Sequence, residues 1–253
     1  MLTNNKIKLI KSLDQKKVRK ESGCFVIEGE KMVRELLQSR FETMEVFAVQ
    51  SYIDELPSAL TKNVEISVVS EKDLERLTHL KTANKAIALA RIPDKDDDSA
   101  CPQNGISIAL ENIQDPGNMG TIIRTADWFG IRDIYCAPGT ADCFSPKVVQ
   151  ATMSALGRVR MHYFKSRDNY LQWLDNNDPM PLYGTFLEGE NIYQKKLVAK
   201  GLLIMGNEGR GISEEVAQRV NEKILIPAFA EEHVESLNVG IATAICLSEI
   251  LRR

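Results

Sequence analysis

Residues 111–124 combine amide, acidic and basic side chains at a turn directly after an apolar run. They read E-N-I-Q-D-P-G-N-M-G-T-I-I-R, and the proline and glycine before Asn118 favour a tight turn into a helix. Asn118 would lie near the helix start, with Arg124 between one and two turns later on the same general face. Asn112, Asn118 and Arg124 are donors suited to ribose and phosphate oxygens. The alternative is a capped helix with a surface arginine.

A glycine-rich turn occupies residues 206–213, between an apolar run and a segment whose start Ser213 can cap. It reads G-N-E-G-R-G-I-S, and its three glycines let backbone groups approach a ligand closely. The spacing matches the frame of a P-loop, but Ile212 takes the place of the lysine that holds phosphate. A dinucleotide fingerprint also fails, because Glu214 stands where its third glycine belongs. The turn therefore predicts a ligand without a phosphate chain.

A third polar turn reads E-S-L-N over residues 235–238 and leads from an acidic loop into an apolar helix. Ile226 and Pro227 end the predicted strand before that loop. Ser236 and Asn238 are residue types that cap helices, so they are interpreted either as caps or as polar groups of a site. Leu237 begins an apolar stripe at helical spacing, whose ordinary role is core packing.

All three turns follow predicted strands of an α/β domain. Strands are expected at residues 106–110, 134–136, 159–164, 182–186, 202–205 and 224–226. Helices are expected at residues 120–129, 146–156, 169–176, 213–221 and 237–252. This alternation predicts a mainly parallel sheet covered on both faces, whose ligands gather at the carboxyl ends of the strands.

An acidic stretch with two prolines divides the chain at residues 93–104 and shows no hydrophobic period. We expect a linker over residues 93–105, a small α/β domain over residues 1–92 and a second domain over residues 106–253. The first domain begins with a basic helix and continues with an apolar C-F-V-I run.

The first 20 residues carry seven basic side chains and one acidic one, a net charge of 7 − 1 = +6. A local patch of this kind matters more for phosphate binding than the net charge of −3 of the whole chain. A solvated protein face is the alternative. A second basic run surrounds His162 and comprises Arg158, Arg160, Lys165 and Arg167. The candidate phosphate contacts of the first run are Lys6, Lys8, Lys11, Lys16, Lys17, Arg19 and Lys20.

With 253 residues, 43% hydrophobic and 26% charged, the chain is long enough for two modest domains. Its apolar runs are far shorter than the roughly 20 residues that span a bilayer, and its start lacks the apolar stretch of a secretory signal. We therefore expect a cytoplasmic protein. The five cysteines are widely spaced without a C-x-x-C pair, and the three histidines are scattered. We expect neither a disulfide framework nor a metal site.

Taken together, N-x-x-x-P-G-N-x-G-x-x-x-R, G-N-E-G-R-G and I-P…E-S-L-N-V closely resemble the three motifs of the SpoU or TrmH-type RNA 2′-O-ribose methyltransferases, members of the SPOUT superfamily. The resemblance covers residues 106–253, and the first domain resembles the substrate-binding domain of rRNA-directed members. It implies a trefoil-knotted, mainly parallel sheet domain that forms a homodimer. It also implies S-adenosylmethionine as cofactor and RNA as substrate, with rRNA favoured over tRNA.

The resemblance also implies roles for individual residues. Arg124 would hold phosphate and ribose and stabilise the developing alkoxide; an arginine pKa above about 12 makes proton abstraction its secondary role. Asn118, Glu208, Ser236 and Asn238 would orient the arginine, the ribose and the cofactor. Asn112 and Lys147 would add RNA contacts. The cofactor-binding set would be Thr185, Phe186, Leu187, Gly206, Asn207, Glu208, Gly209, Ile226, Pro227, Ser236, Leu237 and Asn238.

The chain departs from the family pattern in two segments. Many relatives read Ser-x-Gly-Ala where this chain reads Thr152-Met-Ser154-Ala155, shortly after Gln150, and Gly240 replaces a common serine. These departures concern RNA contacts more than chemistry. Two rival functions are a non-catalytic RNA-binding protein of the same fold, which need not keep Arg124 and Glu208, and a nicotinamide-dependent oxidoreductase, which would need the missing dinucleotide fingerprint.

Overall fold

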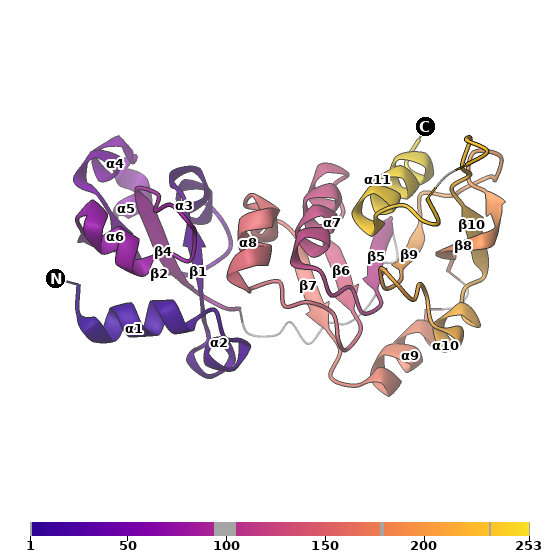
Figure 1. Cartoon of the computed structure of the whole chain (residues 1–253), viewed down its shortest axis with the longest axis horizontal. Helices are drawn as coiled ribbons and strands as arrows, with labels where there is room; N and C mark the ends of the chain where they lie inside the picture. Colours follow the sequence, from indigo (N-terminus) through magenta and orange to yellow (C-terminus); the bar gives the residue numbers. More distant parts are fainter. Residues whose placement is uncertain (1, 94–104, 178–179, 233, 253) are drawn as a thin grey trace. The chain divides into compact units, whose positions relative to one another are not determined.

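The computed structural model describes residues 2–93, 105–177, 180–232 and 234–252, which form two compact units (Figure 1). The first unit comprises Met1–Lys95 with Asp142–Arg158, and the second comprises Asp96–Ala141 with Val159–Arg253. The predicted linker lies almost wholly outside the described residues. None of the described helices has both the length and the apolar character that crossing a membrane requires.

A four-stranded mixed sheet lies at the centre of the first unit, in the order β1-β4-β2-β3. Strand β4 is antiparallel to β1 and β2, and β3 is parallel to β2. The core between this sheet and helices α1 and α6 includes Ile10, Val26, Leu74 and Ile87. The strands are β1 (Cys24–Glu28), β2 (Thr43–Ala48), β3 (Glu65–Val68) and β4 (Ala86–Arg91). The helices are α1 (Asn4–Ser12), α2 (Lys16–Ser22), α3 (Glu30–Leu36), α4 (Gln50–Glu55), α5 (Ser58–Thr61) and α6 (Glu71–Leu77).

The segment Asp142–Arg158 also belongs to the first unit, although the residues on either side of it in the sequence belong to the second unit. It holds helix α8 (Pro146–Thr152) and a 3-10 turn, η1 (Ala155–Gly157). The ring of Phe144 lies 4.9 Å from that of Phe25, and Asp142 accepts a 2.7 Å hydrogen bond from the buried Arg19. The predicted second domain, residues 106–253, includes this segment, whereas the structure places it in the first unit. The predicted domain boundaries stay a prediction.

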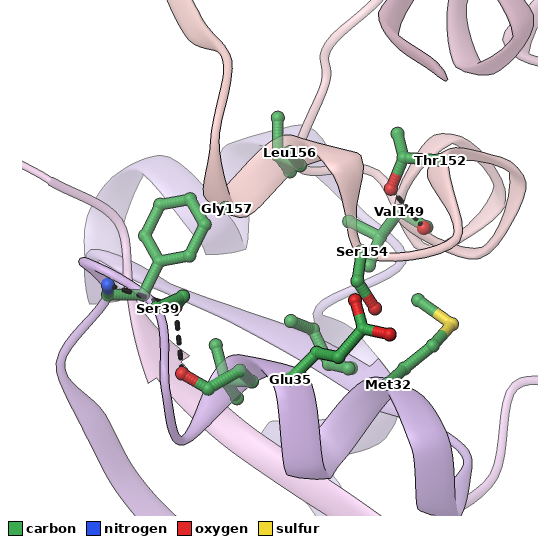
Figure 2. Close-up of a pocket in the computed structure, with 11 residues that line it drawn as sticks. Met32, Glu35, Ser39, Val149, Thr152, Ser154, Leu156 and Gly157 are labelled. Carbon is green, nitrogen blue, oxygen red and sulfur yellow. Dashed lines mark hydrogen bonds between the residues drawn. The ribbon is translucent and has the colours of Figure 1, made fainter. Parts of the chain in front are cut away.

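Helix α8 is shorter than the helix predicted at residues 146–156. Met153 and Ser154 have φ of 47° and 73°, a left-handed conformation that ends the helix at Thr152. A small cavity beside them is lined mainly by apolar groups of α3 and α8, such as Met32 and Val149. Figure 2 shows the Ser154 hydroxyl directed toward the carboxylate of Glu35. The buried Ser154 Oγ nevertheless has no hydrogen-bond partner among the described residues.

Six parallel strands form the sheet of the second unit, in the order β10-β8-β9-β5-β6-β7. All six predicted strands are present, which confirms the parallel α/β prediction. The largest difference is β8, which was predicted to end at residue 186 and continues to Asn191. The strands are β5 (Ile106–Leu110), β6 (Asp133–Cys136), β7 (Arg160–Tyr163), β8 (Leu182–Asn191), β9 (Gly201–Met205) and β10 (Glu222–Leu225). The helices are α7 (Pro116–Trp128), α9 (Arg167–Asp175), α10 (Glu214–Ala217) and α11 (Val239–Ile250).

A capping side chain fixes where α7 begins. Asp115 accepts a 2.8 Å hydrogen bond from the backbone of Asn118, so α7 begins at Pro116, earlier than predicted. Helices α7 and α11 pack together (Figure 1). A Cβ atom at Gly240 would lie 2.8 Å from Cγ2 of Thr121 on α7. The glycine that departs from the family pattern therefore permits this close packing.

The basic run around His162 is paired within the protein. Arg160 donates two hydrogen bonds of 2.7 Å to Asp133, and His162 Nε2 lies 2.8 Å from the same carboxylate. Burial raises the pKa of Asp133, but the hydrogen bonds from His162 and Arg160 outweigh that effect and hold the pKa at about 2. Arg167 contacts Glu111 at 2.8 Å, and Arg158 lies 3.5 Å from Glu35. Carboxylates of the protein itself therefore pair with Arg158, Arg160 and Arg167.

Candidate active site

The first two polar turns meet because they follow neighbouring strands. Leu110 at the end of β5 pairs with Met205 at the end of β9, and Glu111 N donates to the Met205 carbonyl at 2.9 Å. The carboxyl ends of parallel strands share one edge of the sheet, where ligands bind in open α/β folds. The predicted site therefore has a structural basis in the strand order.

The glycine turn after β9 is closed by its own backbone. Asn207 and Gly211 exchange two hydrogen bonds of 2.9 Å, and Asn207 Oδ1 accepts from the backbone of Gly209 and Arg210 at 3.0 and 3.1 Å. A Cβ atom at Gly206 would lie 2.3 Å from the Gly211 carbonyl carbon. Only glycine fits at Gly206, and Asn207 acts as the internal brace of the turn.

Glu208 at the tip of this turn reaches the start of α7. Its carboxylate accepts hydrogen bonds from the backbone of Gln114 and Asp115 at 3.4 and 3.2 Å and from Asn118 Nδ2 at 3.1 Å. Burial raises the pKa of Glu208, but these donors outweigh it and lower the pKa below its ordinary value. Glu208 is consequently ionised at neutral pH.

Asn118 connects Glu208 to the third turn. Its Oδ1 accepts a 2.7 Å hydrogen bond from Asn238 Nδ2, while Asn238 Oδ1 caps α11 by accepting from the backbone of Gly240 and Ile241 at 2.9 and 3.3 Å. We call Glu208, Asn118 and Asn238 the amide relay. Asn238 thus combines the capping role and the site role that the sequence left as alternatives.

Glu111, a buried carboxylate that was not among the predicted site residues, supports the glycine turn. Glu111 is 3% exposed and accepts from Arg167 Nη1 at 2.8 Å and from the backbone of Ser213 at 3.0 Å. Arg167 also contacts the Ser213 hydroxyl and Glu215. The signal available in the sequence was a carboxylate directly after a buried strand, since such a group requires partners.

Arg124 is exposed and makes no hydrogen bond or ion pair with any other described residue. The prediction that Arg124 shares a helix face with Asn118 was wrong. An α-helix turns by about 100° per residue, so two side chains six residues apart point about 120° away from each other around the helix axis. Ser236 and Leu237 are also exposed, and no contact joins either to the amide relay within the described ranges. The structure therefore brings together Asn118, Glu208 and Asn238, but not Arg124, Ser236 or Leu237.

The predicted cofactor residues of β8 lie in an irregular part of that strand. Tyr183 and Gly184 pair with β10, and pairing resumes only at Glu190 and Asn191. Residues 185–189, which we call the excursion, have no partner in β10. Thr185 and Phe186 are half-buried and Leu187 is 76% exposed. Ile226 and Pro227, just beyond β10, are half-buried.

The predicted RNA contacts divide into two groups. Lys6 pairs with Glu45 at 2.6 Å, Lys11 donates to the Thr78 carbonyl, and Arg19 is 3% exposed with bonds to the Leu13 carbonyl and to Asp142. Asn112 braces its own turn, with φ of 59° and its carbonyl bound by Asn207. Lys8, Lys16, Lys17, Lys20 and Lys147 are exposed.

No three His, Cys, Asp or Glu side chains gather into a metal-binding group within the described part of the chain. The expectation of a metal-free protein stays a prediction.

Comparison with known proteins identifies the family. Residues 105–248 match the SpoU rRNA Methylase family, and residues 4–88 match the MRM3-like substrate binding domain. The chain is 30% identical over 245 residues to the 23S rRNA (guanosine(2553)-2′-O)-methyltransferase RlmP of Bacillus subtilis strain 168. That alignment covers 96% of this chain and 94% of the relative.

Solved structures extend the likeness to the whole chain. A TrmH-family protein from Porphyromonas gingivalis superposes with a TM-score of 0.87 at 38% identity, covering 100% of this chain and 99% of the other. An AdoMet-bound rRNA methyltransferase from Sinorhizobium meliloti has a TM-score of 0.86 at 28% identity, covering 100% and 96%. The chain therefore belongs to the SpoU rRNA methylase family and is an RNA methyltransferase.

Proposed function

We propose that this protein methylates a ribose 2′-hydroxyl of ribosomal RNA, with S-adenosylmethionine as the methyl donor. The observation that carries the proposal is the amide relay, which joins three polar turns that each follow a strand of one parallel sheet. The relay residues Asn118, Glu208 and Asn238 present amide and carboxylate groups suited to orienting a ribose.

Exposed groups of the predicted cofactor-binding set suit S-adenosylmethionine. The glycine turn leaves Gly209 exposed, and Leu187 and Leu237 expose 76% and 48% of their surfaces. This surface has no P-loop lysine, in keeping with a ligand that lacks a phosphate chain. When bound, the cofactor supplies an electrophilic methyl group on a sulfonium sulfur. We assign its binding to Thr185, Phe186, Leu187, residues 206–209, Ile226, Pro227, Ser236, Leu237 and Asn238.

Arg124 is our candidate for stabilising the oxyanion that forms at the ribose. Its guanidinium has no partner among the described residues, so its donors are free for phosphate and ribose oxygens. A ribose hydroxyl is weakly acidic, and preorganised donors stabilise the oxyanion as its proton leaves to solvent and the methyl group moves from sulfur to oxygen. Glu208 is a weak base, because its pKa is lowered and its oxygens already accept hydrogen bonds, so we assign it to orienting the amide relay.

Ribosomal RNA is our preferred substrate over tRNA for two reasons. The Bacillus subtilis relative, similar over nearly the whole chain, is named as a 23S rRNA methyltransferase. The first unit, whose sequence matches a substrate-binding domain, exposes Lys8, Lys16, Lys17 and Lys20 for phosphate contacts.

We further propose a homodimer formed by the second unit, a trefoil-knotted chain path and a cytoplasmic location, as the resemblance implies. Trp128 on α7 and Ile241 on α11 expose 87% and 51% of their surfaces. Exposed apolar side chains on two packed helices support a protein partner on this side of the second unit.

Single-turnover methylation of separate rRNA and tRNA pools tests the proposal. We expect labelled methyl groups in rRNA, a rate loss of about 100-fold or more for Arg124→Ala, and a large loss for Arg124→Lys, which keeps the charge but not the fork of donors. Donor binding and melting should stay near wild type. Arg132→Ala is the matched control, because Arg132 is a nearby exposed arginine that pairs with Asp127 at 3.4 Å. Wild-type turnover by Arg124→Ala would remove the catalytic assignment, and label in tRNA alone would remove the rRNA assignment.

A further inference from the structure

Lys223 lies on β10 at the position where pairing with β8 is interrupted. Lys223 pairs with Gly184, whereas the next residue, Ile224, pairs with Glu190. The five residues of the excursion are therefore the part of β8 that has no ladder partner in β10, and they begin directly after the residue paired with Lys223.

Two contacts connect the Lys223 side chain to the excursion. Its ammonium nitrogen lies 4.8 Å from the ring centroid of Phe186 and 3.6 Å from Oε1 of Glu188. Phe186 also packs against the core of the second unit beside Ile212. Phe186 thus contacts both the core of the second unit and the Lys223 ammonium group.

Both ends of the excursion are held by close backbone packing. A Cβ atom at Gly184 would lie 2.8 Å from the Phe186 ring, and one at Gly189 would lie 2.4 Å from the carbonyl carbon of Ile224. Between these ends the strand ladder supplies no partner from β10. The contacts of Lys223 replace the missing ladder in the middle.

Side chains of an extended backbone alternate between its two faces. Phe186 and Glu188 share the face that Lys223 contacts, which places Thr185 and Leu187 on the opposite one. Thr185 and Leu187 belong to the cofactor-binding set of the proposed function, and Leu187 is largely exposed. Phe186 belongs to the same set, but in this arrangement only its backbone, and not its ring, is directed to the cofactor.

We propose that Lys223 is a positioning residue for the methyl donor. It holds Phe186 and Glu188 so that Thr185 and Leu187 present their face to S-adenosylmethionine, and it does not touch the cofactor itself. This inference rests on the proposed function, because it requires the excursion to bind that cofactor.

Calorimetric titration of S-adenosylmethionine into wild type, Lys223→Met and Lys223→Arg tests the proposal. We expect the Kd to rise about 3- to 10-fold in Lys223→Met, the range that an exposed cation–π contact and a surface ion pair together provide. Lys223→Arg keeps both contacts and should bind within about twofold of wild type. Removing a cation would by charge alone leave the binding of this cationic ligand unchanged or tighten it, so a weaker Kd identifies positioning.

Two further readouts separate positioning from general damage. Backbone amides of residues 185–189 should exchange hydrogen faster in Lys223→Met, while turnover at saturating cofactor stays at the wild-type value and only the KM for cofactor rises. Lys200→Met is the control, because Lys200 is exposed and its side chain makes no hydrogen bond or ion pair with another described residue. Equal Kd values for wild type and Lys223→Met, or an equal loss in Lys200→Met, would overturn the inference. Failure of the wild type to bind the donor would instead overturn the proposed function.

Discussion

Asn238 Nδ2 donates a 2.7 Å hydrogen bond to Asn118 Oδ1, although the two residues lie 120 positions apart in the sequence. The direction of this bond is set by Glu208. An ionised carboxylate only accepts hydrogen bonds, so Asn118 must turn its NH2 group toward Glu208. The oxygen of Asn118 is then left for Asn238, which must donate. One charged residue therefore orients two neutral amides.

The substitution Asn238→Asp should break this order while preserving the cap of α11. A carboxylate still accepts from the backbone of Gly240 and Ile241, so the free energy of unfolding should change by less than about 0.5 kcal/mol. It cannot donate to Asn118, and a flipped Asn118 would turn its oxygen toward Glu208. We expect the single-turnover methylation rate to fall about tenfold or more.

Asn238→Ala is the matched control, because it removes both the relay and the cap. It should lose about 1 kcal/mol of stability in urea denaturation as well as activity. Wild-type turnover by Asn238→Asp would show that the bond to Asn118 does not order the site.

The two glycines Gly206 and Gly209 should respond differently to alanine. Gly206→Ala brings a Cβ atom within 2.3 Å of backbone, so we expect a loss of about 1–3 kcal/mol in stability together with donor affinity. At Gly209 the nearest atom is Asn207 Oδ1 at 3.8 Å, and the stability change should stay below about 0.5 kcal/mol. Calorimetry on Gly209→Ala should still detect weaker donor binding, since this exposed glycine would face the cofactor. Unaltered affinity in Gly209→Ala would exclude that contact, and an unaltered melting curve for Gly206→Ala would contradict the close approach.

The sequence predicted the three turns and their strands because each is a local signal, an apolar run followed by turn formers. It did not predict which side chains touch. The bond between Asn118 and Asn238 depends on how α7 packs against α11, and the pair Glu111–Arg167 depends on the position of α9. The prediction that Asn118 and Arg124 share a helix face could have been avoided, because their six-residue spacing already places them on different faces of an α-helix.

Three exposed lysines should account for much of the electrostatic RNA affinity. Lys8, Lys16 and Lys20 are exposed, and their side chains make no hydrogen bond or ion pair with other described residues. Changing all three to Gln should reduce the slope of log K for RNA against log salt by about two to three, because each phosphate contact contributes nearly one. Filter binding at several salt concentrations measures this slope. Lys62→Gln with Lys72→Gln, at exposed positions of the same unit, is the control for a general charge effect. An unchanged slope in the triple variant would mean that this basic run is a solvated face.

Two features of the fold had no local signal. The five unpaired residues of β8 arise from a register change against β10, whose strand follows about thirty positions later. The segment Asp142–Arg158 contacts the rest of the first unit through the bond between Asp142 and Arg19. The sequence predicted Arg19 only as one of seven basic residues in a phosphate-binding run. In both cases the partner is distant in sequence, and charge or hydropathy alone does not identify it.

The ionised Asp133 should make the free energy of unfolding fall at low pH. Its folded pKa, about 2, lies below the ordinary value, so its stabilising contribution is complete above about pH 4 and is lost as pH falls toward 2. Asp133→Asn should cost about 2 kcal/mol at pH 7, because it removes charged hydrogen bonds from Arg160 and His162. Urea denaturation should show the gap between wild type and variant narrowing as the pH falls from about 4 to about 2. Asp175→Asn, at a half-exposed pair with Arg219, is the control and should show a difference below about 1 kcal/mol. A gap independent of pH would contradict the assignment to Asp133.

Ser154 combines two energetically unfavourable features. Its φ of 73° lies in the left-handed region, which costs a residue with a Cβ atom about 1–2 kcal/mol. Its buried hydroxyl, directed toward Glu35 in Figure 2, has no hydrogen-bond partner among the described residues. Glycine removes both features at the expense of about 0.5–1 kcal/mol in greater backbone freedom when unfolded.

We therefore expect Ser154→Gly to stabilise the protein by about 1 kcal/mol in urea denaturation. Ser145→Gly is the matched control, since Ser145 caps the same helix with φ of −64° and no side-chain cap bond. At that φ glycine relieves nothing and only adds freedom to the unfolded chain, so Ser145→Gly should lower stability by a few tenths of a kcal/mol. The opposite signs of the two serine-to-glycine changes identify the backbone conformation as the cause. If Ser154→Gly lowers stability as Ser145→Gly does, the left-handed backbone at Ser154 carries no strain, and its hydroxyl is satisfied in solution.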